Sequence, residues 1–599
     1  MKTKIKNIIL SSALIATAGV FNACSLEEEN PGGFTMDNMA ASSTSAFETF
    51  VNQTFFGMER RLYGTEFFMM YSEADTDLWT YRANINSTYT QYFWFDAGAS
   101  PNKTHTADMW NAIYDGIGSC NNAIALAPKA PYNNEEDRNK QVAIARFMRA
   151  VYYFNAVEQF GAVTLITEPG GPNYSPTRTA PMDIYRQVII PDLEFAVEHL
   201  EKGTDATCTT PTKKAALGML AKAYLQTHEY GTDEYMQKAL DTAKILIADC
   251  EAGGGTYGAY MYPTFKEVFA ESNNWTNKEA LWKHRWYAGS DGHGSSNGNW
   301  KLNRMDEDFQ CALSQFGAWQ ETQASILTYE YDKEGYFMPT QHLLSLFVQD
   351  DGTLDPRYHA SFTTQWNANK NYTWDANTQA NFNKDASVVG QSLASGEMAY
   401  KIVVPQDADY ASEVSKKATS KYLLVDYKDV YDDANRNVKM ILNGKDNLFR
   451  YFYPSLNKHN SSNYYVANAG KRRNGNLNAT FIMRMAEVYL IAAEADLYLN
   501  GGSSALAYIN KVRTRAGAKP LTSTPTIRTI LDERGRELCG EYCRFYDLKR
   551  TGMFKNASYL NETHPDLGQY FKPEYALRPI PQAYIQAIEN GDSYQNPGY

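Results

Sequence analysis

The sequence predicts a mainly α-helical protein, built from tetratricopeptide-like helical hairpins that are interrupted by a large irregular, loop-rich insertion. Three observations lead to this fold class. Apolar residues recur at helical spacing towards both ends of the chain, proline and glycine separate the striped segments, and the middle of the chain lacks a regular period. A non-repeating helical domain fits the same spacing, because the standard repeat consensus is not cleanly present.

The composition is that of a large, acidic, folded protein. Of 599 residues, 43% are hydrophobic and 21% are charged, which argues against a disordered chain or a membrane-embedded bundle. The 57 basic and 68 acidic side chains give a net charge of −11, whereas a nucleic-acid-binding protein needs a basic face. Nine histidines and seven cysteines offer little material for a metal site, and we expect neither a metal nor a cofactor.

The first residues read as a targeting segment. A lysine-rich start precedes an apolar run at residues 8–21, which is long enough for a secretory signal but too short to span a bilayer. An ordinary cleavage site needs small residues three and one positions before the cut, and Phe21 does not meet that need before Cys24. We therefore predict a lipoprotein with residues 1–23 as signal peptide, an acylated Cys24 and residues 24–33 as a flexible acidic tether. The alternative is an ordinary secreted protein with an incidental cysteine.

Helical periodicity is clearest in residues 34–250 and returns in residues 481–599. For example, Trp110, Ile113 and Ile117 share one helical face, and this spacing predicts that they belong to a core. Prolines at helix starts and a Gly-Gly pair at a helix end set several boundaries. We expect helices over residues 108–127, 140–160, 181–200, 211–225, 234–249, 480–499, 503–516 and 526–550.

The middle of the chain, residues 251–480, has a different character. It is rich in Gly, Asn, Asp, Ser and aromatic residues, and it holds seven of the ten tryptophans. A long irregular region inserted in a helical frame is where binding loops are expected. The cysteines that follow Cys24 show no metal-ligand spacing, so buried free thiols are the favoured interpretation.

The densest charged cluster lies near the C-terminus. Glu533, Glu537 and Glu541 follow one another at a spacing of four, which puts them on one face of a predicted helix. Paired carboxylates are the groups that glycoside hydrolases use. Because arginines are interleaved at matching spacing, we favour a lattice of ion pairs with a structural role, and we expect no enzymatic activity.

Several segments together resemble the SusD/RagB-type outer-membrane lipoproteins of Bacteroidetes. Each match alone is weak, but their joint order extends over nearly the whole chain. The acidic residues after Cys24 also resemble the stretch that sends lipoproteins of this group to the cell surface. The matching segments are residues 110–117 (WNAIYDGI), 145–154 (ARFMRAVYYF), 214–225 (KAALGMLAKAYL), 484–495 (RMAEVYLIAAEA), 509–517 (INKVRTRAG) and 595–599 (QNPGY).

The resemblance implies four helical hairpins, a variable loop-rich remainder and a location at the outer membrane, anchored by lipid and exposed at the cell surface. It implies that the protein captures oligosaccharides without cleaving them and delivers them to a SusC-like TonB-dependent transporter. Some relatives handle peptides, so a peptide-binding RagB-like protein is the alternative. A glycoside hydrolase and a pure scaffold repeat protein are further alternatives.

Two segments offer the mixture of ring faces and polar groups that a sugar requires, because sugar C–H groups pack on aromatic rings while hydroxyls bind polar side chains. The first lies at residues 75–84 and continues to Tyr89 and Trp94, and the second extends from residue 282 to 319. Core packing is the alternative for any single aromatic residue. The predicted ligand-binding residues are Asp77, Trp79, Tyr81, Arg82, Trp286, Trp300 and Trp319.

Overall fold

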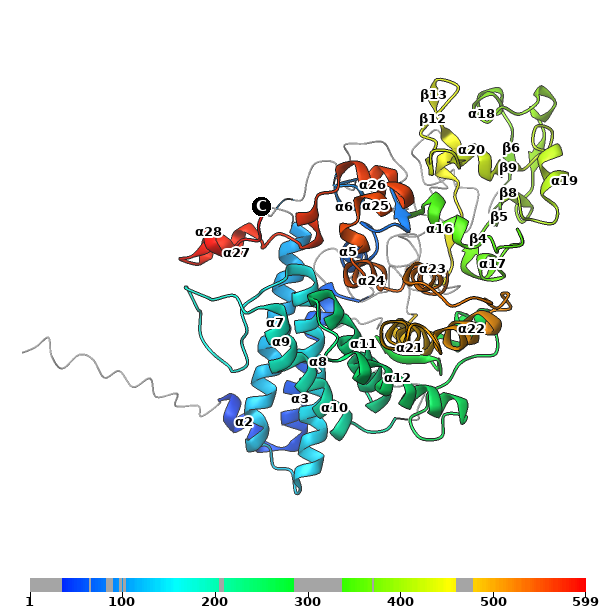
Figure 1. The fold of residues 1–599 in the computed structure, drawn as a ribbon. Helices are drawn as coiled ribbons and strands as arrows, with labels where there is room; N and C mark the ends of the chain where they lie inside the picture. Colours follow the sequence, from blue (N-terminus) through cyan, green and yellow to red (C-terminus); the bar gives the residue numbers. More distant parts are fainter. Residues whose placement is uncertain are drawn as a thin grey trace, which may run out of the picture.

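The structure is a mainly α-helical protein with a smaller mixed lobe on one side of the helices (Figure 1). It is a computed structural model, and it agrees with the fold class that the periodicity predicted. No helix within the described residues is long and apolar enough to cross a bilayer. The described residues are 35–63, 66–81, 90–95, 100, 104–203, 210–284, 337–368, 371–458 and 478–599.

A series of helices, each packed against the next, forms the frame of the molecule. The order of packing follows the sequence, and the large insertion falls between α12 and α21, which nevertheless lie side by side. The series corresponds to four helical pairs, of which the third is completed across the insertion. Its members are α7 (Thr104–Leu126), α8 (Glu135–Phe160), α10 (Ile190–His199), α11 (Lys213–Gln226), α12 (Met236–Glu251), α21 (Met485–Asn500), α22 (Ala505–Arg515) and α23 (Ile527–Leu538).

Two predicted helices are divided in the structure. The segment predicted as 181–200 contains a π-helical turn between α9 (Pro181–Ile184) and α10, next to Pro191, whose missing N–H interrupts the regular ladder. The segment predicted as 526–550 ends at Leu538 and resumes as α24 (Arg544–Arg550). In the turn between them Gly540 and Tyr542 have φ angles of 74° and 63°, which a helix does not permit.

Shorter elements cover the two ends of the frame. On the N-terminal side α3 and α4 pack against α7, and on the C-terminal side α24 packs against α23. The N-terminal elements are α2 (Met36–Ser42), α3 (Thr44–Gln53), α4 (Phe56–Arg61), α5 (Glu66–Ser72) and α6 (Thr90–Phe93). The C-terminal elements are α25 (Ala557–Thr563), α26 (Pro565–Tyr570), α27 (Gln582–Ala587) and α28 (Gly591–Tyr594).

The insertion contains short helices and strands. One strand, β2 (Ala280–His284), pairs antiparallel with β15 (Thr480–Arg484), which the sequence analysis had assigned to the following helix. Residues 362–456 form the lobe at the upper right of Figure 1. Its elements include β4 (Phe362–Thr363), β5 (Gln365–Asn367), α18 (Ala376–Asn381), β8 (Met398–Val403), α19 (Tyr410–Ser415), β9 (Leu423–Asp426), β10 (Tyr431–Asp432), β11 (Asn437–Val438) and β14 (Ser455–Leu456).

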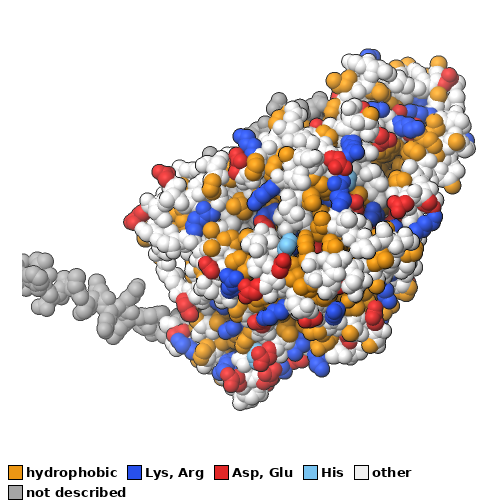
Figure 2. Space-filling view, in the orientation of Figure 1, with side chains coloured by type: hydrophobic (Ala, Val, Ile, Leu, Met, Phe, Trp, Pro, Cys, Tyr) orange, Lys and Arg blue, Asp and Glu red, His pale blue; other side chains and the backbone are white. Residues whose placement is uncertain are grey.

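Four smaller helices and two strands connect the lobe and β2 to the frame. They are α13 (Phe265–Val268), α14 (Glu271–Asn274), β3 (Met338–Pro339), α16 (Gln341–Leu346) and α17 (Arg357–Ser361), with β1 (Trp79–Thr80) as the partner of β3. Trp110, Ile113 and Ile117 are buried, as their helical spacing predicted. On the face drawn in Figure 2, basic and acidic side chains are interspersed, in keeping with the similar numbers of the two kinds in the chain, 57 and 68.

Candidate ligand-binding site and the buried carboxylates

The first predicted ligand segment is part of the core, which corrects the expectation of an open site there. Asp77 and Trp79 have no exposed surface, and Tyr81 is 7% exposed. The Trp79 indole donates a hydrogen bond to the Glu73 carboxylate at 3.1 Å, and the Tyr81 ring stacks on Phe93 at 5.9 Å. These side chains therefore offer neither a ring face nor a polar group to a ligand in this structure.

The reason for this burial is that the polar neighbours of Trp79 have partners from the far end of the chain. Arg544 donates two hydrogen bonds to Asp77, at 2.7 and 2.5 Å, and the Tyr559 hydroxyl donates a third. Burial alone would raise the pKa of Asp77, but Arg544 outweighs it and holds that pKa well below its ordinary value. The polar pattern that suggested exposure is thus a buried ion pair.

The other predicted ligand residues, Arg82, Trp286, Trp300 and Trp319, lie outside the described residues, as does Cys24. At the start of the second predicted segment Trp282 is described, and it is buried on β2. Its ring meets the edge of Phe147 at 4.8 Å. Trp282 therefore belongs to the core between β2 and the helical frame.

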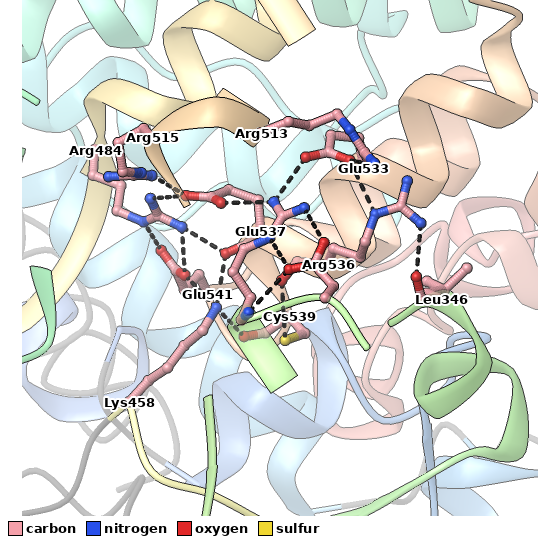
Figure 3. Close-up of polar contacts among 12 residues, drawn as sticks. Leu346, Lys458, Arg484, Arg513, Arg515, Glu533, Arg536, Glu537, Cys539 and Glu541 are labelled. Carbon is pink, nitrogen blue, oxygen red and sulfur yellow. Dashed lines mark hydrogen bonds and ion pairs between the residues drawn. The ribbon is translucent and has the colours of Figure 1, made fainter. Parts of the chain in front are cut away.

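The cluster of glutamates near the C-terminus forms a buried network of ion pairs, here called the carboxylate ladder: Glu533, Glu537 and Glu541 (Figure 3). Two members lie on α23 and the third lies in the turn that follows. Each carboxylate faces at least two cationic side chains. The cations come from five elements or connections and are Arg357, Lys458, Arg484, Arg513, Arg515 and Arg536.

Arg484 lies at the centre of this network, at the last position of β15. Its guanidinium donates to Glu541 at 2.6 Å and to Glu537 at 2.6 Å, and it also pairs with Glu279 at 3.0 Å. Arg515 pairs with Glu279 and Glu537 as well, which links α22 to the residue before β2 and to α23. The ladder therefore joins the insertion to the C-terminal helices of the frame.

The electrostatics of the ladder do not suit acid–base catalysis. Burial alone would raise the pKa of Glu537, but Arg515, Arg484 and Arg357 outweigh it and leave the pKa well below its ordinary value. The pKa values of Glu533 and Glu541 are lowered in the same way. A glycosidase needs one carboxyl group that keeps its proton at working pH, and the ladder provides none. The structural interpretation made from the sequence is confirmed.

Sequence reasoning identified the three carboxylates but missed most of their partners. The pair Arg536–Glu533, at 2.9 Å, is the kind of intrahelical contact that the spacing predicted. Arg357 and Lys458 come from segments with no recognisable periodicity, so no local pattern could have assigned them to the ladder. Elsewhere in the frame, Arg149 binds the Asp192 carboxylate through two hydrogen bonds.

A second kind of buried carboxylate has no cationic partner among the described residues. Glu73, which follows α5, accepts hydrogen bonds from the Trp79 indole and from the backbone N–H of Cys543 at 3.1 Å. Burial raises the pKa of Glu73 to about 7, and these hydrogen bonds only partly oppose that effect. The side chain joins two turns that lie far apart in the sequence and has no open approach for a ligand.

One pocket of the structure is lined by Tyr71, Tyr92, Phe95 and Arg578. Its free volume of about 20 Å³ suits a water molecule rather than a sugar ring. Arg578 is already paired with Asp75 and hydrogen-bonded to Gln159. Within the described part of the chain, no group of histidine, cysteine and acidic residues has the arrangement of a metal site.

Comparison with known proteins identifies the family. A model described as "SusD family" matches residues 278–599, and a second model, "Starch-binding associating with outer membrane", matches residues 34–225. The chain belongs to the SusD family. This agrees with the resemblance that the ordered sequence segments indicated.

SusD relatives match this chain over most of its length. A SusD-like protein P2 of Formosa agariphila is 25% identical over 518 residues, which cover 82% of this chain and 80% of that protein. A SusD-like protein of Bacteroides ovatus is 24% identical over 560 residues, or 90% of this chain and 82% of that protein.

Solved SusD-type structures share the fold. A structure titled "Laminarin binding SusD-like protein" has a TM-score of 0.62 at 21% identity and covers 93% of this chain and all of that one. A SusD homologue from Bacteroides thetaiotaomicron has a TM-score of 0.64 at 18% identity, covering 94% of this chain and 98% of its own. At such identities the likeness establishes the fold alone.

Proposed function

We propose that this SusD-family protein is a lipid-anchored binding protein of the outer membrane that captures oligosaccharides and delivers them to a SusC-like TonB-dependent transporter. The family match carries the proposal, since the two models together span most of the chain and one is described as starch-binding and associated with the outer membrane. Similar solved structures are titled as laminarin-binding or as a complex with a xylogluco-oligosaccharide.

The protein binds its ligand without breaking a bond. Glycoside hydrolysis requires two carboxyl groups with separated pKa values on either side of the scissile bond. The most conspicuous carboxylates of this chain are instead buried and paired with arginine and lysine in the ladder. Their chemistry supports a structural role, which fits a binding protein better than a hydrolase.

The ring faces for the sugar come from the second predicted segment, namely Trp286, Trp300 and Trp319, with Arg82 as a hydrogen-bond donor to hydroxyl groups. This assignment is based on their polar sequence surroundings and on the affinity of indole faces for sugar C–H groups. Asp77, Trp79 and Tyr81 are excluded from it because they are buried.

The test is a binding measurement on the mature protein without its lipid. Calorimetric titration against a panel of β-glucan, xyloglucan and starch oligosaccharides, with peptides of similar mass as the second panel, is expected to give heat with at least one glycan. Replacing Trp286, Trp300 and Trp319 together by alanine is expected to weaken that binding at least tenfold. Tyr174→Ala, at a ring that is 61% exposed on the frame, is the matched control and should leave affinity unchanged. Binding of peptides alone would assign the protein to the peptide-handling class.

The anchor and the transporter are tested in cells. Cys24→Ala is expected to abolish palmitate labelling and to release the protein from the membrane fraction. A tagged wild-type protein should co-purify with a β-barrel transporter from detergent-solubilised outer membranes. Continued labelling of the Cys24→Ala variant would contradict the lipid anchor, and recovery of the protein without a transporter would contradict the partner.

A further inference from the structure

The lobe of residues 362–456 is attached to the frame where the chain both enters and leaves it. Strands β4 and β14 are antiparallel neighbours, with Phe362 opposite Leu456 and Thr363 opposite Ser455. The N–H of Asn457 donates to the carbonyl of Ser361 at 2.7 Å and continues the pairing by one step. These two strands form a narrow neck, a geometry that is typical of an inserted unit.

The lobe has a sheet and packed rings of its own, and its buried side chains are continuous with the core of the frame. Its mixed sheet has the order β5–β8–β9, and the rings of Trp366 and Tyr400 stack at 4.4 Å across the first pair of strands. The buried Lys384 ammonium donates to the carbonyls of Lys417 and Tyr422, at 2.8 Å each, and so fixes a loop of the lobe to α18. Such internal contacts favour movement of the lobe as one body.

The chain has a buried cationic side chain on either side of the neck, and both of these side chains bind the carboxylate ladder. Arg357, five residues before β4, donates to Glu533 at 2.7 Å and to Glu537 at 3.0 Å. Lys458, two residues after β14, lies 2.7 Å from Glu541 and donates to the carbonyl of Glu537 at 2.8 Å. The entry and the exit of the lobe are thus held by the same helix, α23, and by the turn after it.

Away from the neck, the polar contacts of the lobe include one buried hydrogen bond, from the Tyr431 hydroxyl to the carbonyl of Pro339 at 3.0 Å, and several more exposed ones. Arg436, in the turn between β10 and β11, pairs with Glu562 of α25 at 3.0 Å, and both side chains are nearly half exposed. Gln341 of α16 donates to Asp433 at 3.0 Å at another exposed position. Exposed pairs contribute little to stability, whereas a desolvated pair resists separation much more strongly.

We propose that residues 362–456 turn as a rigid unit about the β4–β14 neck, and that Arg357 and Lys458, seated in the carboxylate ladder, form the latch that sets the orientation of the lobe. A hinge of this kind consists of a few residues at the ends of elements, between two well-packed bodies. This inference does not depend on the nature of the ligand.

Hydrogen exchange of the unmodified protein tests the hinge without any substitution. Amides of β4 and β14 are expected to exchange at least about tenfold faster than those of β8 in the lobe and of α21 in the frame, because the neck opens while both bodies stay folded. Equal protection of the neck, β8 and α21 would overturn the proposal. Fast exchange of β8 together with the neck would also overturn it, since the lobe would then unfold rather than turn.

Distance measurement tests the latch. Spin labels are attached at Ser412→Cys on α19 and at Ser503→Cys after α21, both of which are exposed positions. Cys208, Cys250 and Cys311 are replaced by serine in the same protein. The distance between the two labels reports the separation of the lobe and the frame. Lys458→Met is expected to broaden the distance distribution at least twofold relative to Lys445→Met, a matched change at an exposed position of the lobe. Arg357→Lys, which keeps the charge but loses the forked geometry, is the second latch variant and is used if Lys458→Met does not fold. An unchanged distribution in a folded latch variant would overturn the proposal.

Discussion

The carboxylate ladder and the Glu73 turn are two equally buried regions with opposite electrostatics. In the ladder, Glu537 and its neighbours face arginine and lysine side chains, and their pKa values lie below the ordinary range. At Glu73 the partners are N–H groups without a net charge, and burial raises the pKa to about 7. The comparison teaches that the charge of the neighbours, rather than the degree of burial, decides whether a buried carboxyl group is ionised.

The largest effect is expected from breaking the ladder at its centre. Arg484→Met removes the cation that Glu279, Glu537 and Glu541 share, and it leaves buried carboxylates with too few partners. Loss of one partner from a buried ionic network typically costs about 3–5 kcal/mol of unfolding free energy. Urea denaturation of the variant and the wild type at pH 7 measures this loss of unfolding free energy. A loss below about 1 kcal/mol would show that the ladder contributes little to folding.

The next effect is a pH dependence between pH 5 and pH 8 that the Glu73 turn should produce and the ladder should not. Because the pKa of Glu73 is about 7 in the folded protein and about 4.5 in the unfolded chain, its contribution to stability is greatest below pH 4.5 and is lost as the pH rises through 7. Glu73→Gln removes this loss, so the variant should gain on the order of 2–3 kcal/mol relative to wild type between pH 5 and pH 8. Denaturation at both pH values tests this, with the exposed Glu135→Gln as control. The same pH slope in wild type and Glu73→Gln would refute a raised pKa.

A smaller effect is expected when a single hydrogen-bond donor to Glu73 is removed. Trp79→Phe keeps a buried ring but deletes the indole N–H that donates to the Glu73 carboxylate. We expect a loss of about 1–3 kcal/mol at pH 8, where Glu73 is ionised, and a smaller loss at pH 5. Glycan affinity should stay the same, because the ring of Trp79 is fully buried. A selective loss of affinity with unchanged stability would restore Trp79 to the binding site.

The smallest effect is expected at an exposed ion pair, in contrast to the buried pairs of the ladder. Arg436→Ala removes the contact with Glu562, in which both partners are nearly half exposed. Pairs of this kind contribute about 0.2–1 kcal/mol, and salt screens them. The variant should therefore lie within 1 kcal/mol of wild type in urea denaturation at low salt and match it in 1 M NaCl. A loss comparable with that of Arg484→Met would remove the distinction between buried and exposed pairs.

The sequence predicted the helical frame well because its signal is local. Trp110, Ile113 and Ile117 repeat at the helical period, and the packing of α7 follows directly from that. The division of the last long helix was missed because the turn that contains Gly540 and Tyr542 is held by the backbone N–H groups of Gly540 and Cys543, which donate to Glu73 more than 460 residues away. Long-range contacts of this type leave no trace in a window of neighbouring residues.

The candidate site was harder to predict for a related reason. Trp79 with its polar neighbours has the same local appearance as an exposed, sugar-binding tryptophan. The difference lies at the other end of the chain, where Arg544 neutralises Asp77 and the Tyr559 hydroxyl donates a hydrogen bond to it. The role of the glutamates in α23 was correctly inferred, since arginines lie close to them in sequence, although most of their actual partners come from elsewhere in the fold.

The most direct test of the account is to bind an oligosaccharide and then recover it. The mature protein, immobilised and loaded with the best ligand of the glycan panel, is kept overnight at 37 °C, and the eluted ligand is examined by mass spectrometry. The account predicts saturable binding and recovery of the ligand at its original mass. Release of shorter products, in an amount that grows with time and with protein, would contradict it.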